Sequence, residues 1–284
     1  MRLVRYRAAS GVRSGVIVTR DGEDGVVDLG PEPLTAILAT GMDAARAAVA
    51  DASASVSSLA SLRLEPPVRP GKILCLGYNY RGHVPDGVDP TVDDPEFPDV
   101  FVKTANTLGG PADPVVVPAI ADDVDYEGEI AVVIGRRAKD VSVEDALGHV
   151  AGYTILNDVS DRSWQRRQSQ WAMGKCFDGF APLGPWLVTP DEAGDPQDML
   201  VEVVRDGVIT VSQSTATTIF SVAFVVSYLS SVMTLEPGDV VSTGTPQKLP
   251  DAQHAHRPLR AGDAVTVRIE RLGELTTTFI GGPA

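Results

Sequence analysis

Three carboxylates in this 284-residue chain have the residue types and spacing that suit a hard divalent cation: Glu127, Glu129 and Asp158. Glu127 and Glu129 flank Gly128, and side chains two positions apart on a β-strand leave on the same face. Burial would raise the pKa values of two adjacent carboxylates sharply unless a cation neutralises them. Asp158 ends another predicted strand, where functional groups often lie. All-carboxylate ligation is typical of Mg²⁺, with Mn²⁺ or Ca²⁺ as substitutes.

The same spacing is equally compatible with a solvated surface. Glutamates two positions apart are common on exposed edge strands, and an aspartate often lies in a turn. The strand that follows, residues 130–134, is wholly apolar, which favours burial of the glutamate end. Spacing alone therefore leaves both the metal site and the surface pair open.

A second candidate group is His83 with Asp86, in a polar loop that follows a buried strand. A carboxylate three residues after a histidine can orient the imidazole and make it more basic, as a general base requires. The alternative is a surface histidine with an incidental aspartate nearby. A single pair at this spacing does not decide between them.

The elements that must position these residues are mostly short strands. An apolar run at 72–77 predicts a strand buried on both faces, directly before the His83 segment. Residues 127–135 and 150–158 predict two further strands. Gly128 removes bulk on the face opposite the glutamates, so we expect another element to pack closely there. The pattern predicts a β-rich α+β fold.

Residues 1–68 differ from the rest of the chain in their pattern of predicted elements. They predict two short strands, near residues 3–6 and 15–18, and then one or two small helices within 35–60. The proline-rich stretch 65–70 is a stiff connector. We therefore predict a small N-terminal α+β domain at 1–68 and a catalytic domain at 69–284.

Charge and composition exclude several functions. With 24 Lys and Arg against 38 Asp and Glu, the net charge is −14, so we expect neither nucleic-acid nor membrane-surface binding. The apolar run 219–235 is interrupted by serines and is shorter than the ~20 residues of a membrane span. The two distant cysteines and the absence of an N-terminal apolar segment predict a cytoplasmic protein. No nucleotide-binding, serine-hydrolase or zinc-protease motif is present.

Five ordered segments resemble the fumarylacetoacetate hydrolase superfamily over residues 66–284. They are KILCLGYNYRGH, DYEGEIAVVIG, ILNDVSDR, GKCFDGFAPLGPWLVT and STGTP. The resemblance implies a mixed β-sandwich roll, a homodimer, and Mg²⁺ or Mn²⁺ held by Glu127, Glu129 and Asp158. It thereby favours the metal site over the surface pair.

The resemblance also implies roles for other residues. It places His83, Asp86 and Lys175 in catalysis, and it assigns substrate binding to Lys103, Arg162, Gln165 and Thr245. The implied function is metal-dependent hydrolysis of a C–C bond in an acylpyruvate or β-diketo acid, such as a fumarylpyruvate- or acetopyruvate-like compound of aromatic catabolism. The alternatives are a decarboxylase or isomerase of oxaloacetate or 2-hydroxyhepta-2,4-dienedioate type on the same metal site, and a non-catalytic protein that binds a 2-oxo acid.

The chain departs from the family pattern in three places. Asp86 stands where relatives have Glu, and Asp161 adds a negative charge beside the predicted site. Residues 247–249 replace the usual G-V-G, with His254 and His256 close behind. We expect this loop to shape the choice of substrate.

Overall fold

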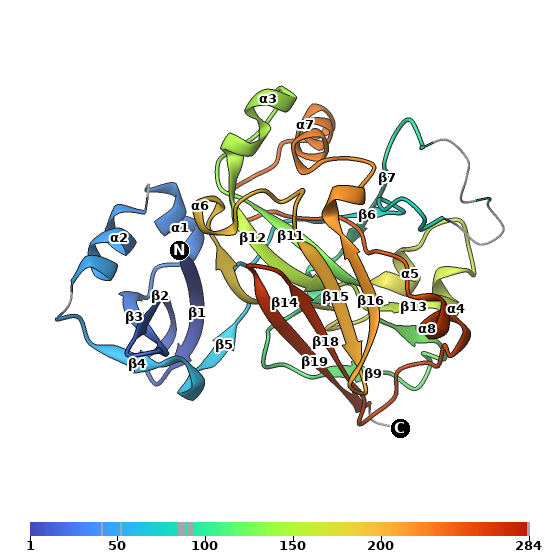
Figure 1. The fold of residues 1–284 in the computed structure, drawn as a ribbon, viewed down its shortest axis with the longest axis horizontal. Helices are drawn as coiled ribbons and strands as arrows, with labels where there is room; N and C mark the ends of the chain where they lie inside the picture. The colour runs from blue at the N-terminus through green and yellow to red at the C-terminus, as the bar shows by residue number, and fades with distance from the viewer. Residues whose placement is uncertain (41, 52, 85–88, 90–93, 283–284) are drawn as a thin grey trace.

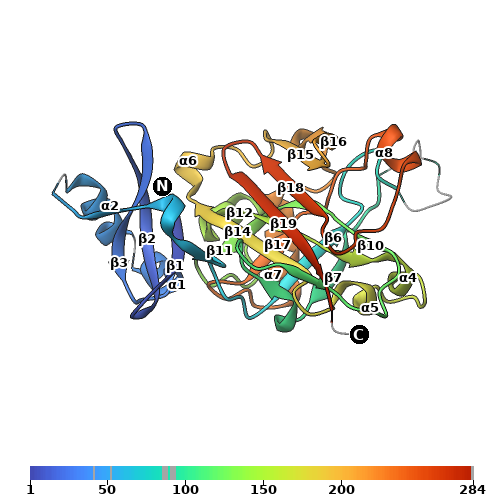
Figure 2. The ribbon, with the colours of Figure 1, turned by 90° about the horizontal axis from the view of Figure 1, so that it is seen from below.

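Two β-sheets that pack face to face form the centre of the molecule (Figure 1 and Figure 2). The computed structural model describes residues 1–40, 42–51, 53–84, 89 and 94–282. Strands hold 40% of the residues and helices 21%, which confirms the predicted β-rich α+β class.

The larger sheet has the order β4-β3-β2-β1-β14-β12-β11-β17-β6-β7, with β5 beside β1 and β8 beside β14. Its strands are β1 (Arg2–Ala8), β2 (Gly11–Arg20), β3 (Glu23–Gly30), β4 (Val56–Ser58), β5 (Arg63–Glu65), β6 (Ile73–Gly77), β7 (Asp99–Lys103), β8 (Leu108–Gly109), β11 (Gly128–Ile134), β12 (Val150–Asn157), β14 (Ala181–Val188) and β17 (Val240–Ser242).

The smaller sheet has the order β16-β15-β18-β19-β9, and two short strands form a separate pair. Its strands are β9 (Val115–Val117), β15 (Leu200–Arg205), β16 (Val208–Ser214), β18 (Ala264–Ile269) and β19 (Gly273–Gly281); the pair is β10 (Val124–Asp125) with β13 (Ser160–Asp161). The helices are α1 (Leu34–Ala39), α2 (Asp43–Ala50), α3 (Val143–Ala146), α4 (Arg162–Gln165), α5 (Ala172–Lys175), α6 (Pro190–Ala193), α7 (Val222–Val232) and α8 (Pro250–His254).

The N-terminal segment extends the larger sheet. β1 pairs antiparallel with β14, with Leu3 opposite Leu187, so the sheet runs on from the first strands into the predicted catalytic part. The segment contains the two predicted strands and two helices, together with β3, β4 and β5, which the sequence pattern did not indicate. A domain boundary at residue 68 stays a prediction.

The side chains of β11 alternate between two cores. Ile130 and Val132 pack into the core between the sheets, whereas Ala131 and Val133 belong to the core on the other face of the larger sheet. A Cβ atom on Gly128 would lie 2.7 Å from Val203 Cγ2, so β11 approaches the smaller sheet closely there, as expected. The glutamates beside Gly128 therefore face away from the sandwich core.

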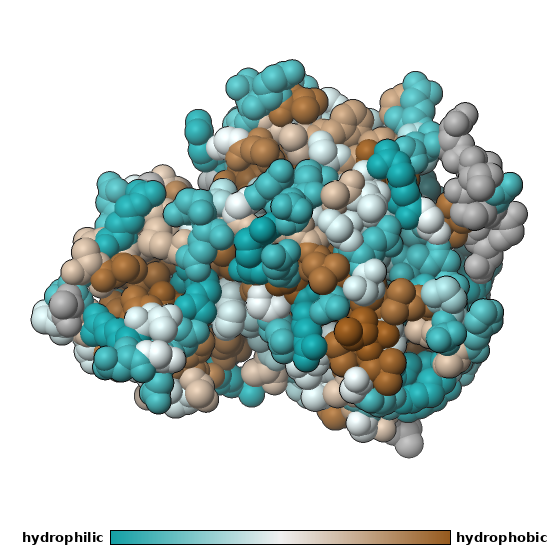
Figure 3. Space-filling model, in the orientation of Figure 1, coloured by the Kyte–Doolittle hydropathy of each residue, from teal (hydrophilic) through white to brown (hydrophobic). Residues whose placement is uncertain are grey.

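The apolar run 219–235 forms α7, which lies beside α3 at one edge of the sheets (Figure 1). The Ser221 hydroxyl accepts a hydrogen bond from Phe224 N and caps the helix. Throughout the described ranges, each helix is too short or too polar to traverse a lipid bilayer. On the face drawn in Figure 3, hydrophobic residues occur in separate patches between hydrophilic ones.

Candidate active site

The register of two neighbouring strands brings the three predicted metal ligands together. β11 and β12 are antiparallel, with Glu129 opposite Leu156 and Gly128 opposite Asn157. Asp158 follows directly, and its N–H donates to Glu127 O at 2.8 Å. One carboxylate oxygen from each of Glu127, Glu129 and Asp158 lies within 4.8 Å of the other two. We call these residues the carboxylate triad.

The triad is buried, which excludes one of the two alternatives that spacing left open. Glu127 is 9% exposed, Glu129 is 1% exposed and Asp158 is 0% exposed. Carboxylates are almost never buried to this degree unless they are paired or bind a metal. A solvated pair on an edge strand is therefore the wrong interpretation.

Three cations compensate two members of the triad. Lys175 Nζ, at the end of α5, lies 2.6 Å from both Glu127 Oε2 and Asp158 Oδ2. Lys103 Nζ donates to Asp158 Oδ1 at 2.5 Å. Arg162 is 2.6 Å from Glu127 Oε1. Glu127 and Asp158 are thus neutralised by the protein itself.

Glu129 is compensated differently. Its Oε2 accepts from Ser242 Oγ at 2.6 Å and from Gly244 N at 2.9 Å, both neutral donors. Its Oε1 is buried and has no hydrogen-bond partner within the described part of the chain. Burial, and then the charges of Asp158 and Glu127, raise the pKa of Glu129 well above its usual range. A divalent cation bound by the triad would satisfy this oxygen and remove the repulsion, so the residues present fit such an ion.

The charged states of Glu127 and Lys175 are fixed by their neighbours. Burial alone would raise the pKa of Glu127, but the charges of Arg162 and Lys175 outweigh burial and lower it. Burial alone would lower the pKa of Lys175, but the charges of Asp158 and Glu127 outweigh burial and raise it. Lys175 is therefore favoured as an ammonium group that can stabilise negative charge.

His83 has the tautomer that a general base needs. Its Nδ1 lies 2.8 Å from Thr245 O, and a carbonyl oxygen only accepts, so Nδ1 carries the proton and Nε2 has a free lone pair. Burial lowers the pKa of His83, which keeps the ring neutral near pH 7. Asp86, the predicted partner acid, lies outside the described residues.

A cavity of about 870 Å³ lies over the triad, a size typical of sites for small molecules. The predicted residues that line it are His83, Glu127, Glu129, Arg162, Gln165, Lys175 and Thr245. Lys103 is not among the lining residues: its side chain is 0% exposed and bonds to Asp158 and to Val159 O. The structure therefore gathers seven of the predicted site residues around one cavity, while Lys103 and the fully buried Asp158 are not among its lining residues.

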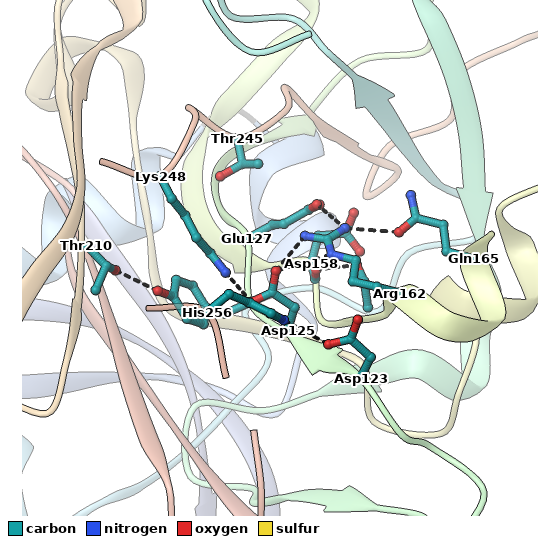
Figure 4. Close-up of polar contacts among 12 residues, drawn as sticks. Asp123, Asp125, Glu127, Asp158, Arg162, Gln165, Thr210, Thr245, Lys248 and His256 are labelled. Carbon is teal, nitrogen blue, oxygen red and sulfur yellow. Dashed lines mark hydrogen bonds and ion pairs between the residues drawn. The ribbon is translucent and has the colours of Figure 1, made fainter. Parts of the chain in front are cut away.

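Figure 4 shows a group of residues beside the triad whose connections the sequence did not indicate. Asp125 accepts from Arg162 through Oδ2 and from Lys248 through Oδ1, and the two cations approach it from opposite sides. His256 Nε2 lies 2.8 Å from Asp123 Oδ1 and lines the cavity. Asp125 is two positions before Glu127, so the two-residue period of a strand already indicated that its side chain lies on the same face as Glu127 and Glu129. No pattern could have paired it with Lys248.

Comparison with known proteins decides the family. The family model described as fumarylacetoacetate (FAA) hydrolase C-terminal matches residues 72–280, which span the triad, His83 and the loop that carries Lys248. The chain belongs to the fumarylacetoacetate hydrolase family. This confirms the resemblance seen in the five sequence segments and the family's β-rich fold.

Relatives across the family differ in reaction. Mitochondrial oxaloacetate tautomerase FAHD2A of Homo sapiens is 36% identical over 291 residues, covering 99% of this chain and 92% of its own. The 2,4-didehydro-3-deoxy-L-rhamnonate hydrolase of Sphingomonas sp. strain SKA58 is 43% identical over 230 residues, covering 78% of this chain and 79% of its own. A maleylpyruvate hydrolase of Sphingobium sp. SYK-6, solved with manganese(II) and pyruvate, is 29% identical with a TM-score of 0.80 and full coverage of both chains. This fumarylacetoacetate hydrolase family member is an enzyme that acts on a small organic acid.

Proposed function

We propose that the enzyme hydrolyses a C–C bond of an acylpyruvate or related β-diketo acid with the help of Mg²⁺ or Mn²⁺. The observation that carries the proposal is the arrangement of His83 and Lys175 around a buried triad whose Glu129 has an unsatisfied oxygen. A divalent cation bound there supplies Lewis-acid polarisation of the 2-oxo acid end of the substrate. The manganese and pyruvate named for the maleylpyruvate hydrolase support the same class of ligands.

The residues of this chain supply the remaining steps. His83 Nε2 takes a proton from a water molecule, which adds to the distal carbonyl carbon. The bond between that carbon and the neighbouring methylene then breaks, and the electron pair leaves as the enolate of pyruvate. Lys175, a fixed ammonium group, faces the negative charge that develops. Return of the proton gives pyruvate and a carboxylic acid, so one water is consumed for each bond broken.

Four more residues are assigned to the substrate or its surroundings. Thr245, Arg162 and Gln165 line the cavity, and we assign them to the substrate's carboxylate, as the family resemblance implies. We assign Lys103 to holding Asp158, because its ammonium group is bonded to that carboxylate and its side chain is fully buried.

A second candidate, tautomerisation of oxaloacetate on the same residues, is favoured by one observation. The human oxaloacetate tautomerase matches the chain over nearly its whole length, including the N-terminal segment. A proton moved by His83 Nε2 from carbon to oxygen would serve this reaction, and no water would be needed.

Parallel assays separate the two candidates. Acetopyruvate and fumarylpyruvate are followed with Mg²⁺ by release of pyruvate, and oxaloacetate is followed by the loss of its enol absorbance. We expect pyruvate release from at least one acylpyruvate. Turnover of oxaloacetate with complete inactivity on both acylpyruvates would contradict the hydrolase proposal and leave the tautomerase.

We also propose a homodimer in the cytoplasm. β7 is the last strand of the larger sheet, and it exposes Val100 (38%) and Val102 (48%), while Met173 on neighbouring α5 is 63% exposed. Apolar edge strands are usually covered. Cys75 and Cys176 are both free thiols, as a reducing compartment predicts. Light scattering after gel filtration tests the dimer, with Val102→Glu expected to give monomers.

A further inference from the structure

We propose that Lys248 binds a second carboxylate of the substrate, so that the enzyme prefers 2-oxo diacids over 2-oxo monoacids of the same length. This inference deepens the proposed function and rests on it, because it takes the 2-oxo acid end of the substrate to lie at the triad. Lys248 belongs to the segment 247–249, which we expect from the sequence to shape the choice of substrate.

Lys248 differs from the other lysine that lines the cavity. Lys175 bonds directly to two members of the triad, whereas Lys248 Nζ bonds to Asp125 Oδ1 at 2.5 Å and lies 4.3 Å from the centre of the Tyr126 ring. Its side chain is 15% exposed and lines the cavity. The Tyr126 hydroxyl donates to Thr210, which fixes the ring on which the ammonium group rests. Lys248 is thus a held cation that a molecule in the cavity can reach.

Asp125 can release Lys248 without becoming an unpaired buried charge. Its Oδ2 accepts from both Nε and Nη2 of Arg162, at 3.2 and 3.0 Å, on the side opposite Lys248 (Figure 4). If Lys248 turns to a substrate carboxylate, Asp125 keeps this two-bond contact. The usual cost of breaking a buried ion pair, an uncompensated charge, is therefore avoided.

The charges of the carboxylate triad, of Asp125 and of their cationic partners favour a dianion. Four carboxylates face four cations: Asp125, Glu127, Glu129 and Asp158 against Lys103, Arg162, Lys175 and Lys248. With every group ionised, these charges cancel, and a divalent ion would leave two positive charges. A 2-oxo diacid carries two negative charges and would restore neutrality, whereas a monoacid would leave one buried positive charge uncompensated.

The spacing allows one small molecule to reach both ends. Lys248 is bonded to Asp125, which is two residues from the triad member Glu127, and two residues of extended chain span at most ~7 Å. Beside Lys248, Gln247 has a buried Oε1 with no hydrogen-bond partner among the residues described, and Gln247 also lines the cavity. This oxygen is an acceptor for a hydroxyl group or water that accompanies the distal carboxylate.

A matched pair of ligands tests the inference. 2-Oxoglutarate and 2-oxopentanoate have the same chain length and differ only in the terminal carboxylate. Their binding to the full chain with Mg²⁺ is measured by titration calorimetry for the wild type, Lys248→Met, Lys248→Arg and Lys139→Met, the last a surface lysine paired with Asp140 as control. We expect the wild type and Lys139→Met to favour 2-oxoglutarate by roughly 10- to 100-fold, as for a hydrogen bond to a charged group. Lys248→Met should reduce the preference to below about threefold, and Lys248→Arg should restore most of it.

The outcomes separate this inference from the proposed function. Equal binding of the two acids by the wild type, or an undiminished preference in Lys248→Met, overturns the role of Lys248 alone. Equal weakening of both acids in Lys248→Met also overturns it, because Lys248 would then only support Asp125. Failure of the wild type to bind either acid would contradict the proposed function as well. If Lys248→Met does not fold, the wild-type ratio and Lys248→Arg still decide.

Discussion

The two ends of the cavity are built by different means. At the inner end, the triad is held by the register of β11 and β12 and by the neighbouring β17, and its members are at most 9% exposed. At the outer end, Asp123 and Asp125 meet Lys248 and His256 from a loop more than a hundred residues later. The inner end is held by strand pairing and is buried, whereas the outer end consists of partly exposed side chains joined by ion pairs.

Under the proposed function, the chemistry resides at the inner end of the cavity and the selectivity at the outer end. A metal ligand set has to be rigid, because small displacements change coordination. A specificity pocket tolerates replacement, because each contact there adds only a small free energy. Substitutions at the inner end should therefore abolish the reaction, and substitutions at the outer end should redirect it.

The largest effect is expected from Glu129→Gln at the inner end. The amide removes the charge that the divalent ion requires, so kcat should fall by at least about 10³-fold and thermal stabilisation by Mn²⁺ should disappear. Ser242→Ala, which removes one neutral donor to Glu129, is the matched control and should weaken metal affinity by only ~10- to 100-fold. A wild-type response of Glu129→Gln to Mn²⁺ would show that the triad is not the metal site.

His83→Asn should lower kcat by ~10²- to 10⁴-fold while the Mn²⁺-linked thermal shift stays as in the wild type. The wild-type pH profile gives an independent measurement. Burial lowers the pKa of His83, and the neutral ring is the base, so kcat/KM should be constant near neutrality and fall as pH decreases. The acid limb should have its midpoint below the usual histidine value of ~6.5. A midpoint above that value contradicts the assignment.

Lys103→Met should destabilise the protein more than any exposed lysine or arginine. It leaves Asp158 with one cation fewer in a fully buried site, and breaking such a pair costs about 3–5 kcal/mol. Arg257→Ala is the control: this residue is 50% exposed and pairs with Asp206 and Asp263, so its loss should cost less than ~1 kcal/mol. Urea unfolding of the metal-free protein measures both. Equal losses would mean that the inner end is not more tightly coupled than the surface.

His256→Ala should have the smallest effect. Its pair with Asp123 lies at the rim, with exposed fractions of 34% and 26%, so we expect a change in unfolding free energy below ~1 kcal/mol. KM for an accepted substrate should change less than about threefold, with kcat retained. A loss of kcat comparable to that of His83→Asn would move the catalytic centre toward the outer end.

Strand periodicity predicted the shared face of Glu127 and Glu129, and the structure places their carboxylates close together. The parity of Glu127 and Glu129 and the small residue between them followed from a two-residue period, and the family segments added Asp158. Periodicity cannot foresee contacts such as Asp125 with Lys248, which join a strand end to an irregular loop. The same limit applies to Lys103, whose place beside Asp158 depends on the pairing of β7 with β6 at the edge of the sheet.

The missed strand β3 has a different cause. Its sequence, EDGVVDLG, is rich in residues with low β-propensity, so pattern alone did not indicate a strand. The Asp21-Gly22 turn before it was a usable signal: both residues have positive φ, and Arg20 pairs with Glu23 across a two-residue hairpin loop. Turn chemistry was more informative here than hydrophobic alternation.

Gly128 is constrained on two sides: β11 lies close to the smaller sheet there, and the neighbouring residues Glu127 and Glu129 belong to the carboxylate triad. Any side chain there would meet Val203 and Val267 on one face, and the backbone could yield only by displacing the two glutamates on the other. A scan of all substitutions for activity would therefore rank Gly128 with the metal ligands, although it has no side chain to offer a substrate. Loss of activity on substitution of Gly128 would then mean that packing in the sandwich core fixes the positions of the two glutamates, and not that Gly128 takes part in the reaction.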